Sequence, residues 1–196
     1  MDKLYMILLC LMIVPILICI KYSRKIKSDV ASSIVKCLIF AIVTILSNGL
    51  SAFSGNETFS YIMEALYRFS FDLMLIYVLQ YSQQYTRVFH EVSPFKKGCF
   101  IIAYLDGILL FLNIIFHNVF TIETVRFPNF DMYHVADKSI IFYFHYVFAY
   151  GLVVCIIASF IIKIIQIPDF YRKKYLPILV LICVITVSKF ICGISE

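Results

Sequence analysis

One stretch of the chain combines the length of a membrane span with a row of charged side chains. It runs from Tyr61 to Tyr85 and reads YIMEALYRFSFDLMLIYVLQYSQQY. About 20 apolar residues suffice to cross a bilayer, yet this stretch carries Glu64, Arg68 and Asp72, each four residues after the last. On a helix this spacing puts the three side chains on one face. Because a charge at the centre of a membrane costs about 2.5–3.5 kcal/mol, the row has to face protein or water, and neighbouring helices have to be arranged around it.

The composition indicates that lipid is the solvent of the whole chain. Of 196 residues, 62% are hydrophobic and 15% are charged, whereas about 25% of the residues of a soluble domain are charged. A soluble protein of this composition would expose large apolar patches. The apolar runs show no alternation of period two, which argues against a transmembrane barrel. The predicted fold is therefore all-α, a single polytopic helical bundle over residues 1–196.

Six apolar segments are long enough to be predicted as membrane spans. They cover residues 4–20, 33–53, 61–82, 98–117, 140–165 and 176–192. The sixth segment closes four residues before Glu196. With the N-terminus outside, either the protein has six spans or these are six of seven. We favour the second alternative, because a C-terminus that signals to the cytoplasm needs a seventh span.

The basic residues of the loops predict the orientation. Ten Lys and Arg residues follow the first, third and fifth segments: Lys21, Arg24, Lys25, Lys27, Arg87, Lys96, Lys97, Arg172, Lys173 and Lys174. Only Lys3, Arg126 and Lys138 lie on the opposite side. Loops rich in Lys and Arg stay in the cytoplasm. The sequence therefore predicts a multi-pass protein of the cell membrane, with its N-terminus outside and its basic loops in the cytoplasm.

The fourth segment supplies further polar groups inside the predicted membrane region. Asp106 is predicted to lie near mid-membrane. Asn113 and His117 come seven and eleven residues after it, which places them on nearly the same helix face. The third and fourth segments are expected to be antiparallel neighbours. Arg68 would then have Asp72 and Asp106 at a similar depth, which predicts pairing between arginine and carboxylate.

Two interpretations of these groups remain open. In the first, a buried ion network fixes helix packing and consists of Glu64, Arg68, Asp72 and Asp106. In the second, a polar pocket open to the outer face binds a ligand and is lined by Glu64, Arg68, Asp106, Asn113, His117 and His145. Ionisable groups inside a membrane are candidates for function by default.

Other classes of site are not expected. The seven cysteines are scattered and form no CxxC pair, which argues against a zinc or disulfide framework. His117 and His145 could hold a metal with Glu64, but no HxxxH or HExxH spacing occurs, so hydrogen bonding is favoured and neither a metal nor a cofactor is predicted. No catalytic spacing is present, so the chain is not predicted to be an enzyme. Nucleic acid is excluded as a partner, because the basic residues lie at span ends rather than on one patch.

The outer loop and the aromatic residues of the fifth segment contain no pattern that identifies a ligand. The outer loop from Thr121 to Ser139 contains no binding motif. The aromatic residues of the fifth segment, between Tyr143 and Tyr150, are interpreted as an interfacial belt with core packing rather than as a cage for a cationic ligand.

The third and fourth segments carry a resemblance to a known family. The relevant residues are YIMEALYRFSFDLMLIYVLQYSQQYTRVF and IIAYLDGILLFLNIIFHNVF, preceded by the basic first loop. With Glu64 early in the third segment and Tyr77 and Tyr81 at its end, the layout resembles the N-terminal seven-span sensor region of bacterial histidine kinases and diguanylate cyclases. The resemblance implies an extracellular N-terminus and a last span that passes a signal to a cytoplasmic output domain.

The predicted function is therefore that of a membrane-embedded sensor. It would perceive a ligand or a membrane state on the outer side and signal to a cytoplasmic output domain or partner protein. Besides the lipid bilayer, a second copy of the chain is a candidate partner. The alternative is a small transporter or channel with a polar path between the third and fourth segments.

Overall fold

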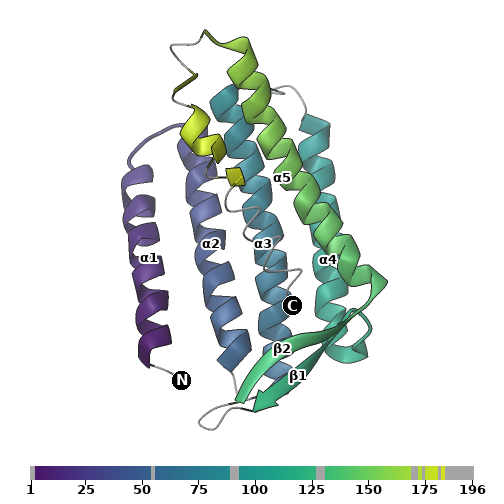
Figure 1. The fold of residues 1–196 in the computed structure, drawn as a ribbon. Helices are drawn as coiled ribbons and strands as arrows, with labels where there is room; N and C mark the ends of the chain where they lie inside the picture. Colours follow the sequence, from purple (N-terminus) through teal and green to yellow (C-terminus); the bar gives the residue numbers. More distant parts are fainter. Residues whose placement is uncertain are drawn as a thin grey trace.

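The computed structural model shows a helical bundle with one small β-hairpin (Figure 1). It describes residues 3–53, 56–88, 93–126, 131–168, 172–173, 175–180 and 182–183. The long helices are α1 (Lys3–Ser23), α2 (Asp29–Phe53), α3 (Glu57–Thr86), α4 (Ser93–Phe116) and α5 (Ile140–Gln166). They coincide with the first five predicted segments. Residues 175–180 are also helical, whereas most of the sixth predicted segment, 176–192, lies outside the described residues.

Three of the helices are long and apolar enough to cross a membrane, which indicates a membrane protein. They are Asp29–Ser51 within α2, Pro94–Phe116 within α4 and Ile140–Gln166, which is α5. The predicted count of six spans is not supported. The described apolar part of α1, Leu11–Ser23, is shorter than a span requires. Helix α3 is continuous, but its charged row breaks the apolar sequence.

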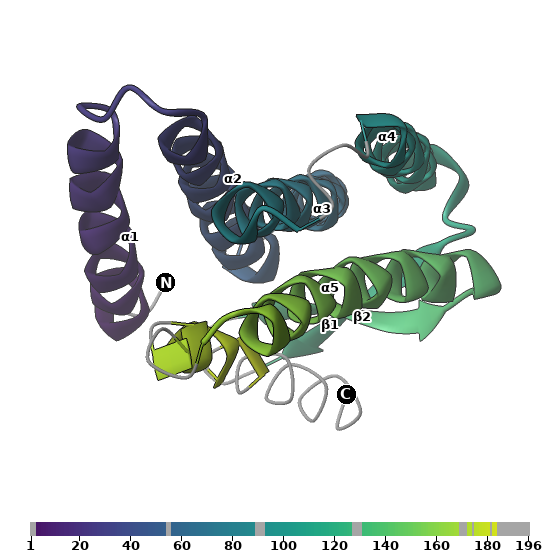
Figure 2. The ribbon, with the colours of Figure 1, turned by 90° about the horizontal axis from the view of Figure 1, so that it is seen from above.

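Helix α3 is the central element of the bundle. It contacts α2, α4, α5 and the hairpin, and the view from above shows it between α2 and α4 with α5 alongside (Figure 2). Its buried residues recur every three or four positions, and they include Tyr61, Glu64, Arg68 and Asp72. The charged row is therefore turned toward protein, as the helical spacing predicts.

Hydroxyl side chains line the contact between α2 and α3. The Oγ1 of Thr44 lies 3.0 Å from the Oγ of Ser70, and nearer the opposite end of the pair Ser33 donates a hydrogen bond of 2.9 Å to Gln84. All of these residues except Gln84 are buried. Small hydroxyl residues allow membrane helices to approach closely and to hydrogen-bond across the contact.

The segment predicted as an outer loop is an antiparallel hairpin. Strands β1 (Phe120–Arg126) and β2 (Asp131–Lys138) pair with Glu123 opposite His134 and Val125 opposite Met132. The hairpin connects the end of α4 to the start of α5 (Figure 1). Its inner edge is apolar, since Phe120 is fully buried, and this edge closes one end of the bundle.

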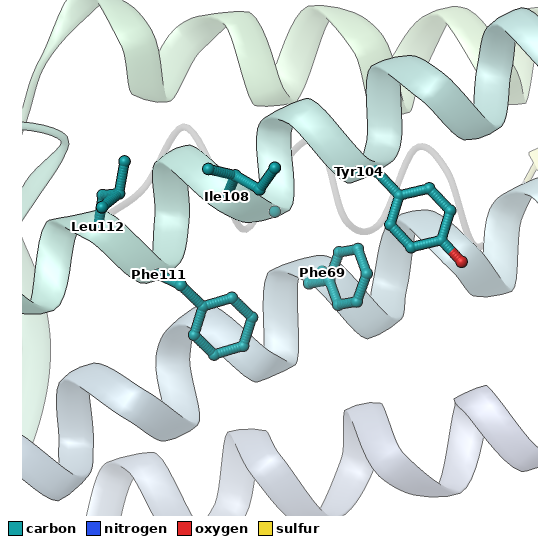
Figure 3. Close-up of a pocket in the computed structure, with 6 residues that line it drawn as sticks. Phe69, Tyr104, Ile108, Phe111 and Leu112 are labelled. Atoms are coloured by element: carbon teal, nitrogen blue, oxygen red, sulfur yellow. The ribbon is translucent and has the colours of Figure 1, made fainter.

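A close contact between α3 and α4 depends on a glycine. Figure 3 shows Phe69 of α3 between Tyr104 and Phe111 of α4, with ring centroids 5.8 and 6.3 Å apart. A Cβ atom on Gly107 would lie 2.5 Å from the Cδ2 atom of Phe69. These residues also line a shallow apolar pocket of about 310 Å³ on the side of the bundle.

We predict that Gly107→Ala destabilises the fold, because the added methyl group displaces the Phe69 ring. Overpacking of this kind costs about 1–3 kcal/mol, which chemical denaturation in detergent, followed by circular dichroism, would measure. Gly151→Ala is the matched control, since nothing lies within 4 Å of its Cβ position. A Gly107→Ala effect that persists undiminished in a Phe69→Ala background would contradict the proposed clash.

Candidate functional site

The charged groups of the interior form two separate sets at successive depths along α3. The outer set is the ion pair of Glu64 and Arg68, one helical turn apart. Both residues are only 7% exposed. Ser51 of α2 donates a hydrogen bond of 3.2 Å to the Oε2 atom of Glu64. A buried charge is tolerated when it is paired and hydrogen-bonded. Here the ion pair lies within α3, and α2 supplies a further hydrogen bond to the glutamate.

Aromatic rings surround the guanidinium group of Arg68. Its Cζ atom lies 4.2 Å from the ring centroid of Phe142 and 5.8 Å from the centroids of Tyr67, Phe120 and Tyr146. The rings come from α3, β1 and α5. A cation over aromatic faces is stabilised, by about 2 kcal/mol or more when it is desolvated. The rings of α5 and β1 thus enclose a cation of the protein itself.

The inner set joins three helices through three fully or nearly fully buried side chains. Asp72 of α3, Asp106 of α4 and His145 of α5 are 0%, 2% and 3% exposed. The Nδ1 atom of His145 lies 2.8 Å from the Oδ2 atom of Asp106 and 3.3 Å from the Oδ2 atom of Asp72. The three offer one ligand atom each within 4.8 Å of one another. We call these residues the inner cluster.

Asp72 is the least satisfied member of the inner cluster. Neither of its carboxylate oxygens has a hydrogen-bond partner within the described part of the chain. Its one charged contact among the described residues is the Nδ1 atom of His145 at 3.3 Å, which lies closer to Asp106, and a buried carboxylate without hydrogen bonds is rare because its desolvation is not offset. The position next to His145 shows that Asp72 points into the cluster rather than toward lipid.

A third group of polar contacts fixes the hairpin on the bundle. The side-chain amide of Asn113 accepts a hydrogen bond of 2.7 Å from the Val119 backbone N–H and donates one of 2.9 Å to the Phe120 carbonyl. The Tyr61 hydroxyl accepts a hydrogen bond of 3.0 Å from the Ile122 backbone N–H. These bonds tie β1 to both α3 and α4, and so connect the hairpin to the helices that carry the charges.

His117 lies beside this junction rather than inside it. Its backbone has a φ of 50°, in the left-handed region, where the chain leaves α4. Its side chain is exposed, and its ring centroid lies 4.5 Å from that of Tyr61.

The structure thus divides the predicted site residues among three places. Glu64 and Arg68 form the outer pair, Asp106 and His145 belong to the inner cluster, and Asn113 and His117 lie at the hairpin junction. The predicted pairing of Arg68 with Asp72 and Asp106 is not what is found. Arg68 turns toward Glu64, one helical turn away on its own helix, and His145 takes the two aspartates.

Sequence reasoning missed the contact between Asp72, Asp106 and His145. Asp106 lies ten residues before the last residue of α4, and His145 lies five residues after the first residue of α5. Counting from the ends of two upright helices therefore puts His145 nearer the outer boundary than Asp106. In the fold α5 runs obliquely across the bundle (Figure 1), which brings the two side chains together.

Neither of the two pockets described on the surface reaches the buried charges of the outer pair or the inner cluster. One is the apolar pocket between α3 and α4, and the other is lined by Asp29, Val30, Gln84 and Arg87. Because rings of β1 and α5 cover Arg68, the predicted outer pocket would need a conformation in which the hairpin or α5 has moved.

The comparisons with known proteins provide no family assignment. No protein-family model matches the chain, and neither curated proteins nor solved structures give a significant match. Any functional conclusion therefore depends on the residues and their geometry.

We predict that Arg68→Met strongly destabilises the protein, because it leaves the Glu64 carboxylate buried without its partner. Breaking one side of a buried ion pair costs about 3–5 kcal/mol, measurable by denaturation in detergent. The double variant Glu64→Gln/Arg68→Met should recover most of this loss, since it removes both charges. Lys97→Met, at an exposed position of α4, is the control. A double variant that is no more stable than Arg68→Met alone would contradict the pairing.

Proposed function

We propose that the chain is a membrane-embedded sensor region. In this proposal it perceives a ligand or a membrane state on the outer side and passes a change in helix packing to a cytoplasmic output domain or partner protein. The observation that carries the proposal is the attachment of the hairpin to the helices that bear the charges, through the hydrogen bonds of Tyr61 in α3 and Asn113 in α4 and the packing of Phe120 against Phe142 of α5. Such contacts give the hairpin a physical connection to three helices at once.

The orientation proposed for this function has the N-terminus and the hairpin outside. Successive helices alternate in direction (Figure 1), so the basic residues that follow α1 and α3 and precede α4 share one end. Lys25, Arg87 and Lys97 are examples, and all three are exposed. The hairpin lies at the opposite end. This charge distribution supports cytoplasmic basic loops and a topology in which α1 and α3 also cross the membrane.

The mechanism requires two packings of the bundle. In the described packing the hairpin is held by Asn113 and Tyr61, and β1 contributes the Phe120 ring to the surroundings of Arg68. A ligand that displaces the hairpin would open the candidate residues Glu64, Arg68 and His117 to the outside. It shifts the equilibrium only if its affinity differs between the two packings.

The resemblance to sensor regions of bacterial histidine kinases and diguanylate cyclases supports the same class of function. It concerns the third and fourth segments, which correspond to α3 and α4 and carry Glu64, Tyr77 and Tyr81. In those families a cytoplasmic output domain receives the signal. A homodimer would be compatible with the proposal, because the outer faces of α4 and α5 are apolar and exposed.

The second candidate is a small transporter or channel. The row of Glu64, Arg68 and Asp72, continued by Asp106, extends polar chemistry from one end of the bundle toward its middle. A permanent path for ions is disfavoured, because aromatic rings and the hairpin enclose the outer pair in the described packing. This enclosure favours the sensor.

We predict that the hairpin is accessible from outside intact cells. In a variant whose seven native cysteines are replaced by serine or alanine, Val125→Cys in β1 should react with a membrane-impermeant maleimide on intact cells. Lys25→Cys, in the connection between α1 and α2, should react only after lysis. Labelling of Lys25→Cys on intact cells with protection of Val125→Cys would reverse the orientation.

We predict that a change at the hairpin alters the spacing of the opposite helix ends. Spin labels at Phe95 of α4 and Ile165 of α5, both exposed, would report this distance by double electron–electron resonance in nanodiscs. Tyr61→Phe removes the hydroxyl that accepts the Ile122 N–H and should shift the distance distribution. Tyr143→Phe, which removes an exposed hydroxyl of α5, should not.

Two outcomes of these measurements would contradict the sensor. The first is an unchanged distance distribution in Tyr61→Phe. The second is a flux of Na⁺, K⁺ or H⁺ through proteoliposomes that disappears in Asp106→Asn, which would establish the transporter instead.

A further inference from the structure

The inner cluster has the donor set of a metal centre. Asp72, Asp106 and His145 come from three different helices, and each offers one ligand atom within 4.8 Å of the others. Carboxylate oxygen and imidazole nitrogen are ligands of zinc and related divalent transition metals. Asp72 is a second indication, because its carboxylate is fully buried, points toward His145, and has oxygen lone pairs that make no hydrogen bond in the described chain and are available for coordination.

The distances fit coordination after a small expansion. Bonds of about 2.0–2.2 Å from zinc to nitrogen or oxygen place neighbouring tetrahedral ligands about 3.3–3.6 Å apart. The Nδ1 atom of His145 is 3.3 Å from Asp72 and 2.8 Å from Asp106. Moving Asp106 outward by roughly half an ångström would bring its distance from His145 to this spacing, and the ligand atoms of the two aspartates lie within 4.8 Å of each other. The second oxygen of Asp72 or a water molecule would supply the fourth ligand.

The charge of the cluster also matches a divalent cation. Two aspartates and a neutral histidine carry two negative charges, and Arg68 is already paired with Glu64. In an apolar interior an uncompensated charge is strongly unfavourable. One divalent ion would neutralise both carboxylates and be bound by all three side chains.

We propose that Asp72, Asp106 and His145 bind one divalent transition-metal ion of the zinc class, which ties α3, α4 and α5 together. The ion is structural: it stabilises the packing of the three helices in the interior. The proposal is independent of the sensor function, because metal content is measured on the isolated chain, whether or not the chain signals or conducts ions.

The test uses the purified full chain in mild detergent. After treatment with a chelator and reloading with Zn²⁺, followed by desalting, elemental analysis should find about one zinc per chain. Asp72→Asn, Asp106→Asn and His145→Gln should each reduce this to background. Glu57→Gln replaces an exposed carboxylate by its amide, and His117→Gln repeats the histidine substitution at an exposed position; both should retain the metal. Thermal unfolding of the wild type should shift to higher temperature with Zn²⁺, and that of the cluster variants should not.

A second measurement covers the case in which the cluster variants do not fold. Co²⁺ loaded into the wild type should give the visible absorption bands of a tetrahedral site, without the near-ultraviolet charge-transfer band of a cysteine ligand. Three results would overturn the proposal: no bound metal in the wild type, equal zinc in the cluster variants and the wild type, or a cysteine band in the Co²⁺ spectrum. The second and third would identify an adventitious ion on the cysteines or the surface, and the first would leave the cluster as an ion pair.

Discussion

The structure depends on the need to neutralise the charges that α3 carries into an apolar interior. The helix has a 7% exposed glutamate, a 7% exposed arginine and a fully buried aspartate on one face. Lipid cannot solvate that face, and the apolar surfaces of α4 and α5 alone could not cover it without leaving charges unpaired. The covering elements therefore contribute specific groups: a hydroxyl from α2, an aspartate from α4, a histidine from α5 and an aromatic ring from the hairpin. The position of α3 at the centre of the bundle follows from this requirement.

Much of this arrangement could be predicted from the sequence, because it follows from periodicity and hydropathy. The ranges of the five described long helices and the inward orientation of Glu64, Arg68 and Asp72 both depend on local spacing and on the cost of burying charge. A local argument was sufficient, since a helix face is fixed by residues three and four positions apart.

The partners of those charges could not be predicted in the same way. Pairing between Asp106 and His145 depends on the oblique course of α5, which no local pattern in α5 encodes. The hairpin was missed because its strands have few apolar positions in strict alternation: Phe120 and Ile122 are buried, while Val125 is exposed. The aromatic residues between Tyr143 and Tyr150 were interpreted as a belt with core packing, but the contact of Tyr146, together with Phe142, with Arg68 was not predicted. In each case the missing information was the relative placement of two elements distant in the sequence.

The two sets of charges differ in what a change of packing would do to them. Glu64 and Arg68 lie on one helix, so α3 can move as a unit while their ion pair stays intact. Asp72, Asp106 and His145 lie on three helices, so any separation of α4 or α5 from α3 removes a partner from a buried charge. Such a movement is unfavourable by several kcal/mol unless a ligand, a cation or water replaces the lost partner. If the bundle has two packings, the inner cluster is therefore where their energies differ most. Its occupancy by a cation would decide how firmly the three helices are held together.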